Sequence, residues 1–270
     1  MAHLLDRTTT KALALDVRGT LIDPVHDIPM SPDLASSLVR LSCDGIKIGI
    51  VTATSLASLQ TLIVPCLVTA SIQLQAPHEW SNPFLVYVDS GTAAYSLDAD
   101  GTPRKMAEYE FQSFKDEEVH AILKVLDSVC SRLRWPKPLW KVKPGQINFY
   151  CGSDWATRHK LAHVIKSAFS AIALHHVQVM VPTAKETIDI ALSNKARPML
   201  DLLHRCEIPP VALVTVGDSM QPGGADLDMF DAALGCVGVQ VGEIQPGSDV
   251  AFMEGYGPER AYQILCDLLD

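Results

Sequence analysis

Three short apolar runs, each followed at once by polar residues, constrain this chain more than any other feature of its sequence. A strand that is buried on both faces of a parallel sheet is apolar nearly throughout, whereas a half-exposed strand alternates between apolar and polar residues. The sequence therefore predicts a parallel sheet with polar groups at its strand ends. The runs and the residues that follow them are Ala12–Leu15 before Asp16, Ile46–Val51 before Thr52-Ala53-Thr54-Ser55, and Phe84–Val88 before Asp89-Ser90-Gly91.

Segments with helical spacing lie between these runs. Ser31-Pro32 offers an N-cap and a first-turn proline, and Leu34, Leu38 and Leu41 recur at intervals of three or four residues. Strands and helices that alternate in this way are typical of an α/β fold in which helices cover both faces of a parallel sheet. Such sheets bind ligands at the carboxyl ends of their strands.

The pattern changes between residues 93 and 185, where three tryptophans and many charged residues occur. Helical spacing predicts helices over Asp116–Leu133 and Ala156–Ala171, with a strand over Gln146–Tyr150 between them. The stretch therefore resembles an inserted α+β unit.

The first pattern then resumes, with a helix from Lys195, a strand over Val211–Val216 that leads into Gly217-Asp218, and a last strand over Cys236–Val241. We expect a core domain of residues 1–92 and 186–270, interrupted by an inserted domain of residues 93–185.

Composition bounds the partners and the compartment. A formal net charge of -9 argues against nucleic acid or an anionic membrane as the main partner. The seven cysteines form no C-x-x-C pair, which is typical of free thiols in a reducing compartment. Residues 1–11 lack the apolar core of a signal peptide, and Thr61–Ile72 is about half of a membrane span. We expect a cytoplasmic protein, and the sequence leaves its oligomeric state open.

The polar groups at these strand and helix ends are those that phosphoryl transfer requires. A carboxylate can attack phosphorus and form an aspartyl phosphate. A hydroxyl and an ammonium can hold the phosphoryl oxygens, and further carboxylates can hold Mg²⁺. In chain order the candidates are Asp16, Thr52 or Thr54, Lys195, Asp218 and Asp226.

These residues stand in motifs that resemble those of the haloacid dehalogenase-like (HAD-like) phosphohydrolases. Asp16-Val17-Arg18-Gly19-Thr20-Leu21 resembles the first motif, D-x-D-G-T-L, and Ala53-Thr54-Ser55 looks like the second. Ser193-Asn194-Lys195-Ala196 is similar to the third motif. The fourth, G-D-x-x-N-D-x-x-M-F, is resembled by Gly217-Asp218-Ser219 and Ala225–Phe230, with Met220–Gly224 as an apparent insertion.

The position of the inserted unit and the Asp89-Ser90-Gly91 segment are similar to the Cof-type branch, which includes sugar phosphatases, sucrose-phosphate phosphatase and phosphomannomutase. The resemblance implies a Rossmann-type core with a C2-type cap. It also implies Mg²⁺-dependent hydrolysis of a small phosphorylated metabolite, such as a sugar phosphate or a phosphoglycerate-like compound.

The resemblance further implies a role for each matching residue. Asp16 would be the nucleophile, and Thr54 and Lys195 would hold the phosphoryl group, with Thr52, Ser55 and Arg18 as further substrate-binding residues. Asp16, Asp218 and the backbone carbonyl of Arg18 would hold Mg²⁺, and Asp226 would orient the metal shell through Lys195 or water.

Arg18 departs from the first motif, whose second aspartate protonates the leaving group and then activates water. A guanidinium stays protonated and cannot act as a base, and loss of such assistance costs about 10²–10⁴ in rate. Three interpretations remain open. In the first, Arg18 binds a substrate anion while another group, such as Asp226 or Asp228, assists hydrolysis. In the second, the leaving group needs little help from a general acid. In the third, the chain is a catalytically impaired binding or regulatory protein. A phosphotransferase or phosphomutase is a further alternative.

The inserted unit also carries a basic cluster interleaved with tryptophans. It forms either a surface that steers an anionic substrate beneath a stacking ring, or a solvated loop whose tryptophans pack on the cap. The cluster consists of Arg132, Arg134, Lys137, Lys141 and Lys143, with Trp135 and Trp140.

Overall fold

The computed structural model describes residues 6–76, 78, 80–81, 84–135, 139–152, 154–182, 186–220, 224–233, 235–242 and 250–270. Their strands form two sheets. The larger sheet contains β1 (Ala12–Leu15), β2 (Lys47–Val51), β3 (Phe84–Val88), β4 (Ala93–Leu97), β5 (Pro103–Lys105), β10 (Leu213–Gly217), β11 (Val237–Gly242) and β12 (Ala251–Glu254). The smaller sheet contains β6 (Leu139–Val142), β7 (Gln146–Tyr150), β8 (Gln178–Met180) and β9 (Thr187–Ala191).

The larger sheet has the strand order β12-β11-β10-β1-β2-β3-β4-β5. The strands from β12 to β3 are parallel, and β4 and β5 extend the sheet as antiparallel strands. This sheet confirms the expected α/β core.

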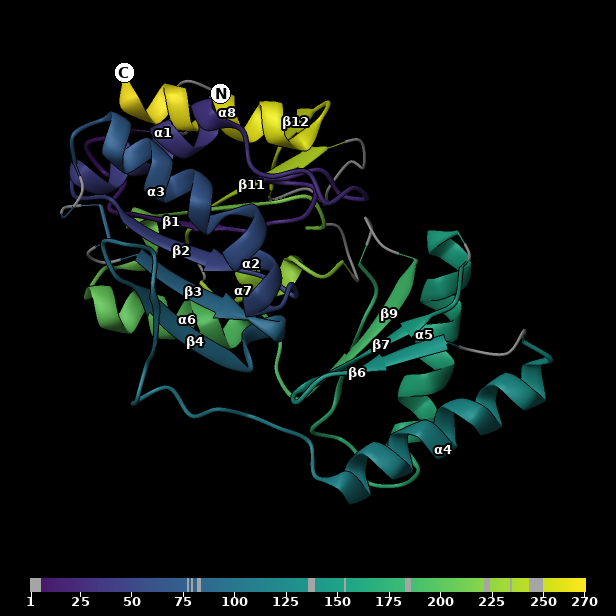
Figure 1. The fold of residues 1–270 in the computed structure, drawn as a ribbon. Helices are drawn as coiled ribbons and strands as arrows, with labels where there is room; N and C mark the ends of the chain where they lie inside the picture. Colours follow the sequence, from purple (N-terminus) through teal and green to yellow (C-terminus); the bar gives the residue numbers. More distant parts are fainter. Residues whose placement is uncertain are drawn as a thin grey trace.

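Helices cover both faces of the larger sheet (Figure 1). Leu13 and Leu15 of β1 belong to one buried cluster, while Ala12 and Ala14 belong to another. Successive side chains of a strand point to opposite faces, so a central strand needs apolar residues at every position. The helices of the first cluster are α1 (Pro32–Cys43), α2 (Leu56–Leu62), α3 (Val64–Gln73) and α8 (Gly257–Leu269). Those of the second are α6 (Ala196–Cys206) and α7 (Leu227–Ala232).

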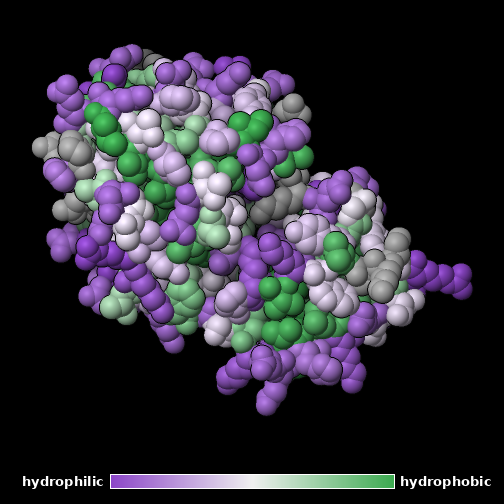
Figure 2. All heavy atoms as spheres, viewed as in Figure 1, coloured by the Kyte–Doolittle hydropathy of each residue, from purple (hydrophilic) through white to green (hydrophobic). Residues whose placement is uncertain are grey.

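The smaller sheet has the order β6-β7-β9-β8 and is antiparallel. The helices α4 (Asp116–Leu133) and α5 (Trp155–Ser170) pack on one of its faces, where Ile147 and Phe149 of β7 lie in a separate apolar core. The other face of this sheet is turned toward the larger one (Figure 1). In the space-filling view the two bodies touch, and hydrophilic residues surround patches of hydrophobic residues on both of them (Figure 2).

Sheet membership differs from the expected boundaries at three strands. The limits 92/93 and 185/186 would assign β4 and β5 to the insertion and β9 to the core, but β4 and β5 pair in the larger sheet and β9 pairs in the smaller one. No segment with helical spacing separates β3, β4 and β5, so the alternation of strands and helices that marks the core in the sequence is missing here. The strand Cys236–Val241 is also not the last one, because the short edge strand β12 follows it.

The apolar stretch Leu56–Gln73, which spans α2 (Leu56–Leu62) and α3, is long and apolar enough to cross a membrane by length and composition alone. It is longer than the expected stretch of Thr61–Ile72. Leu67 and Ala70 of α3 lie in the core beside α1, and 39% of the stretch is buried. No disulfide joins any of the seven cysteines.

Candidate active site

The topology brings the polar strand ends together. Strand β1 lies between β2 and β10, so Asp16, Thr52 and Asp218 follow three adjacent parallel strands at the same edge of the sheet. This edge is where open α/β sheets bind ligands. Lys195 directly precedes α6, and Asp226 directly precedes α7.

Lys195 connects the segment that carries Asp16 with the segment that carries Asp226. Its Nζ lies 2.5 Å from Asp16 Oδ1 and also donates to Asp226 Oδ1. All three side chains are buried, with exposed fractions of 4% for Lys195, 7% for Asp16 and 1% for Asp226. A lysine buried to this degree needs paired charges to offset its desolvation.

The site holds more negative than positive charge. Burial raises the pKa of Asp16 to about 6, with Lys195 opposing and Asp226 adding to the shift. Burial, followed by repulsion from Asp226 and Asp16, raises the pKa of Asp218 well above its usual range. For Lys195, burial alone would lower the pKa, but the two carboxylates raise it. The ammonium is therefore retained, and the carboxylates are poised to take a further cation.

Two backbone contacts fix the positions of the carboxylates. The Asp226 Oδ2 accepts hydrogen bonds from the backbone N–H groups of Asp218 and Ser219 at 3.1 and 3.0 Å. A Cβ on Gly217 would lie 2.6 Å from the same Oδ2, so only glycine permits this approach. On the other side, a Cβ on Gly19 would lie 2.3 Å from Asp218 Oδ2.

The structure also distinguishes the two candidate threonines. The Thr52 Oγ1 accepts a hydrogen bond from the Thr54 backbone N–H at 3.0 Å. The Thr54 Oγ1 is buried, and no described residue hydrogen-bonds to it. Ser55 caps α2, since its Oγ accepts from the Ser58 backbone N–H at 3.4 Å. Of these groups, the Thr54 hydroxyl is available to a ligand.

Arg18 lies over the site. Its guanidinium forms an ion pair with Asp27, and its side chain is 17% exposed while that of Asp27 is 74% exposed. Arg18 lines both a small cavity of about 30 Å³ that contains Asp16, Thr54, Lys195 and Asp218, and a larger cavity of about 490 Å³. It therefore stands where a substrate that occupied both cavities would pass.

The larger cavity lies between the two sheets. Its walls on the core side include Arg18, Thr54 and Ser58, and its walls on the smaller sheet include Asn148 and Tyr150 of β7. Along β7, Asn148 and Tyr150 alternate with Ile147 and Phe149 of the apolar core, because successive side chains of a strand point to opposite faces. Other residues that line it are Pro24, Val25, Asp27, Ala53, Ser55, Lys141, Lys143, Glu186 and Thr187.

The basic cluster of the insertion divides into parts with different surroundings. Trp135 and Trp140 pack against the apolar core of the smaller sheet, whereas Lys141 and Lys143 line the larger cavity. Arg132 and Arg134 lie at the end of α4, outside the lining of that cavity. Lys137 lies outside the described residues. The cluster is therefore neither one surface nor one loop. Its tryptophans pack on the core of the smaller sheet, and two of its lysines line the cavity.

Asp89 and Asn148 were not among the site residues expected from the sequence. The Lys143 Nζ donates to Asp89 Oδ1 at 2.9 Å, and the Asn148 Nδ2 donates to Asp189 Oδ1 at 2.6 Å. Asp89 follows an apolar strand, as Asp16 does, and this position was the signal that could have marked it.

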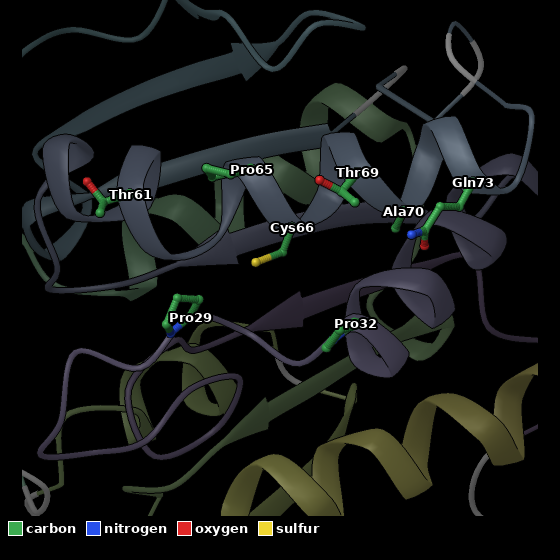
Figure 3. Close-up of a pocket in the computed structure, with 8 residues that line it drawn as sticks. All are labelled: Pro29, Pro32, Thr61, Pro65, Cys66, Thr69, Ala70 and Gln73. Carbon is green, nitrogen blue, oxygen red and sulfur yellow. The ribbon is translucent and has the colours of Figure 1, made fainter.

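A different cavity, of about 280 Å³, lies between α3 and the segment that leads into α1 (Figure 3). Prolines, Cys66 and uncharged polar side chains line it, and burial raises the pKa of the Cys66 thiol. It has none of the charged groups that phosphoryl chemistry requires.

Asp16, Asp218 and Asp226 offer carboxylate oxygens that all lie within 4.8 Å of one another, the one such cluster of possible metal ligands among the described residues. Hard divalent cations such as Mg²⁺ prefer oxygen donors of this kind. Mutual repulsion also contributes to the raised pKa of both Asp16 and Asp218. The donor set therefore fits Mg²⁺ chemically.

No protein-family model and no curated protein matched the sequence. Solved structures do resemble it. An IMP-bound mutant of the IMP-nucleotidase of Plasmodium falciparum has a TM-score of 0.74 and 17% identity, over 96% of this chain and 68% of that one. Trehalose-6-phosphate phosphatase of Aspergillus fumigatus has a TM-score of 0.59 and 15% identity, over 98% and 97% of the two chains.

A haloacid dehalogenase-like hydrolase from Bacteroides thetaiotaomicron has a TM-score of 0.58 and 12% identity, over 94% of this chain and 99% of that one. At these identities the likeness concerns the fold. The chain thus has the α/β fold of the haloacid dehalogenase-like hydrolases.

Proposed function

We propose that this protein is a HAD-like phosphohydrolase that transfers the phosphoryl group of a small phosphorylated metabolite to water through Asp16. The observation that carries the proposal is the contact of the buried Lys195 with both Asp16 and Asp226. An ammonium that two carboxylates hold at the end of a parallel sheet can stabilise the charge of a phosphoryl group in transfer.

The proposed reaction has two steps. The Asp16 carboxylate attacks phosphorus, the bond to the leaving oxygen breaks, and an aspartyl phosphate forms. Water then attacks the phosphorus, the bond to Asp16 breaks, and inorganic phosphate leaves. Lys195 and the unpartnered Thr54 hydroxyl would hold the phosphoryl oxygens through both steps. With a pKa of about 6, Asp16 is mostly ionised at neutral pH and can act as the nucleophile.

Mg²⁺ is the proposed cofactor. Asp16, Asp218 and the backbone carbonyl of Arg18 would hold it. Asp226 would act mainly by orienting Lys195 and the loop of Asp218, because both of its oxygens already accept hydrogen bonds. When bound, the ion would offset negative charge on the phosphoryl oxygens.

Arg18 supports a second candidate, a catalytically impaired HAD-fold protein that binds a ligand. An arginine cannot donate a proton to the leaving group and then act as the base that activates water. Its pairing with the exposed Asp27 also supports a role in anion binding, in which a substrate anion would replace Asp27 as its partner.

A sugar phosphate or a phosphoglycerate-like compound remains the proposed substrate class, within a Cof-type or sucrose-phosphate phosphatase-like branch. The cavity of about 490 Å³ supports a small ligand, and its serine, asparagine and tyrosine side chains, together with Lys141, suit hydroxyl and anionic groups. IMP is an additional candidate, because one structural neighbour was solved with IMP bound. A phosphomutase would return the phosphoryl group to a sugar and would require a bisphosphate activator.

We further propose a division into a core domain and a cap domain, with boundaries moved to follow the sheets, so that β4 and β5 join the core and β9 joins the cap. A cytoplasmic location, without nucleic-acid or membrane partners, remains a prediction from composition.

Phosphate release from p-nitrophenyl phosphate, sugar phosphates and IMP with Mg²⁺ tests the proposal in the wild type, Asp16→Asn and Arg18→Asp. An active wild type and a silent Asp16→Asn are expected. A silent wild type combined with an active Arg18→Asp would favour the impaired protein. Equal activity in the wild type and Asp16→Asn would refute the role of Asp16.

A further inference from the structure

The turn Asp89-Ser90-Gly91 braces the loop that carries Thr54. The backbone N–H of Asp89 donates to the Thr54 carbonyl at 3.2 Å, and that of Ser90 donates to the Thr52 carbonyl at 3.0 Å. The position of the Thr54 hydroxyl therefore depends on the conformation of this turn.

That conformation is costly for its residues. Asp89 and Ser90 have φ values of 48° and 58°, and two consecutive residues other than glycine rarely adopt this left-handed region. A conformation of this kind persists only where the surrounding structure holds it in place. Gly91 is confined as well, since a Cβ there would lie 2.6 Å from Pro198 and 2.9 Å from the carbonyl oxygen of Asn194. The turn thus also touches the segment that presents Lys195.

The smaller sheet supplies a cation to this turn. Lys143 lies between β6 and β7, and its Nζ donates to Asp89 Oδ1 at 2.9 Å and to the Ala53 carbonyl at 3.1 Å. The side chains of Lys143 and Asp89 are only 14% and 18% exposed. A charge-assisted hydrogen bond that is largely shielded from water is stronger than one on the open surface.

We propose that Lys143 is a positioning residue of the active site. One ammonium from the cap holds both the strained turn at Asp89 and the backbone of Ala53, and so fixes the Thr54 loop for phosphoryl binding when the cap lies against the core. The proposal rests on the proposed function, in that it assigns phosphoryl binding to this loop. It explains how the position of the cap affects a group on the core.

A positioning residue and a substrate contact differ in their kinetic effects. Because Lys143 acts through Asp89 and Ala53, Lys143→Met should lower kcat about tenfold or more for every phosphomonoester that is hydrolysed, with KM changed by about twofold at most. Lys143→Arg should recover most of the loss. Lys124→Met, the same change at an exposed lysine of α4, should match the wild type. A loss confined to KM, for one ester but not another, would overturn the proposal.

A double-mutant cycle tests whether Lys143 acts through Asp89. Asp89→Asn suits the left-handed conformation and removes the charge. The double variant Lys143→Met with Asp89→Asn should lose far less than the product of the two single losses, because both changes break one interaction. Losses that multiply would overturn the proposal.

Amide hydrogen exchange gives a readout that needs no activity. In Lys143→Met, the amides of Asp89 and Ser90 should exchange about tenfold faster or more than in the wild type, and in Lys124→Met they should not. Unchanged exchange would overturn the proposal. If the wild-type protein releases no phosphate from any ester, the proposed function fails, and the exchange result alone decides whether Lys143 positions the loop.

Discussion

Gly19 lies directly against the carboxylate of Asp218, so that a Cβ on Gly19 would come within 2.3 Å of Asp218 Oδ2. Gly19 also has a φ of 83°, which residues with a side chain rarely adopt. The turn after β1 therefore needs glycine both for its conformation and for the close approach of the two segments that carry Asp16 and Asp218.

Gly19→Ala should accordingly abolish phosphate release and lower the free energy of unfolding. Gly45→Ala is the matched control, because Gly45 also has a positive φ, 91°, but a Cβ there would meet nothing within 4 Å. Both variants carry the conformational cost of about 1 kcal/mol, and Gly19→Ala should lose about 1–3 kcal/mol more, as measured by urea denaturation. Equal losses would show that the contact with Asp218 is unimportant.

Replacement of Lys195 tests the charge balance of the site. Lys195→Met leaves Asp16 and Asp226 buried without their shared cation, which should lower the free energy of unfolding by about 3–5 kcal/mol. Lys160→Met, at an exposed position of α5, should change it by less than about 0.5 kcal/mol. A stable Lys195→Met protein would mean that the carboxylates are neutral in the metal-free protein.

The two threonines should separate stability from activity. Thr54→Val removes a hydroxyl to which no described residue hydrogen-bonds, so phosphate release should fall by about 10²-fold while the unfolding free energy changes little. Thr52→Val removes the acceptor of the Thr54 backbone N–H and should cost about 1 kcal/mol or more of stability. A reversal of these two outcomes would assign the phosphoryl contact to Thr52.

Asp16 should make the stability of the metal-free protein depend on pH. Its pKa is raised from 3.8 to about 6, so its ionisation opposes folding above about pH 6, and this cost disappears as the pH falls toward 4. Asp16→Asn should therefore be more stable than the wild type by on the order of 2–3 kcal/mol near pH 8, with little difference near pH 4.

Mg²⁺ should alter this comparison. It should raise the Tm of the wild type at neutral pH and have little effect on Asp16→Asn, because the ion binds the folded carboxylates. Differential scanning calorimetry with and without Mg²⁺ and EDTA measures both effects. A wild type that is more stable than Asp16→Asn near pH 8 without metal would contradict the cost of burying an ionised Asp16, which raises its pKa.

Sequence reasoning reached the parallel sheet because buried strands such as β1 and β3 are uninterrupted apolar runs. It selected Asp16 and Asp218 because they follow such runs, and Lys195 because it directly precedes a helix. The expected helix over Asp116–Leu133 coincides with α4.

The remaining features depend on contacts that no local pattern encodes. The strands β4 and β5 are short, and they join the larger sheet because β4 pairs with β3 and β5 pairs with β4. The ion pair of Lys143 with Asp89 joins residues 54 positions apart. By contrast, the hydrogen bond from the Thr54 backbone N–H to the Thr52 hydroxyl is a local contact between residues two positions apart.

The position of β1 between β2 and β10 also affects how the chain is made. Ala12 pairs with Lys47 on one side but with Leu213 on the other. During synthesis at about 5–20 residues per second, the second edge of β1 must wait on the order of ten seconds or more for its partner. The nascent chain therefore presents an apolar strand edge, which is prone to pair with other chains, until the segment beyond the cap has emerged from the ribosome.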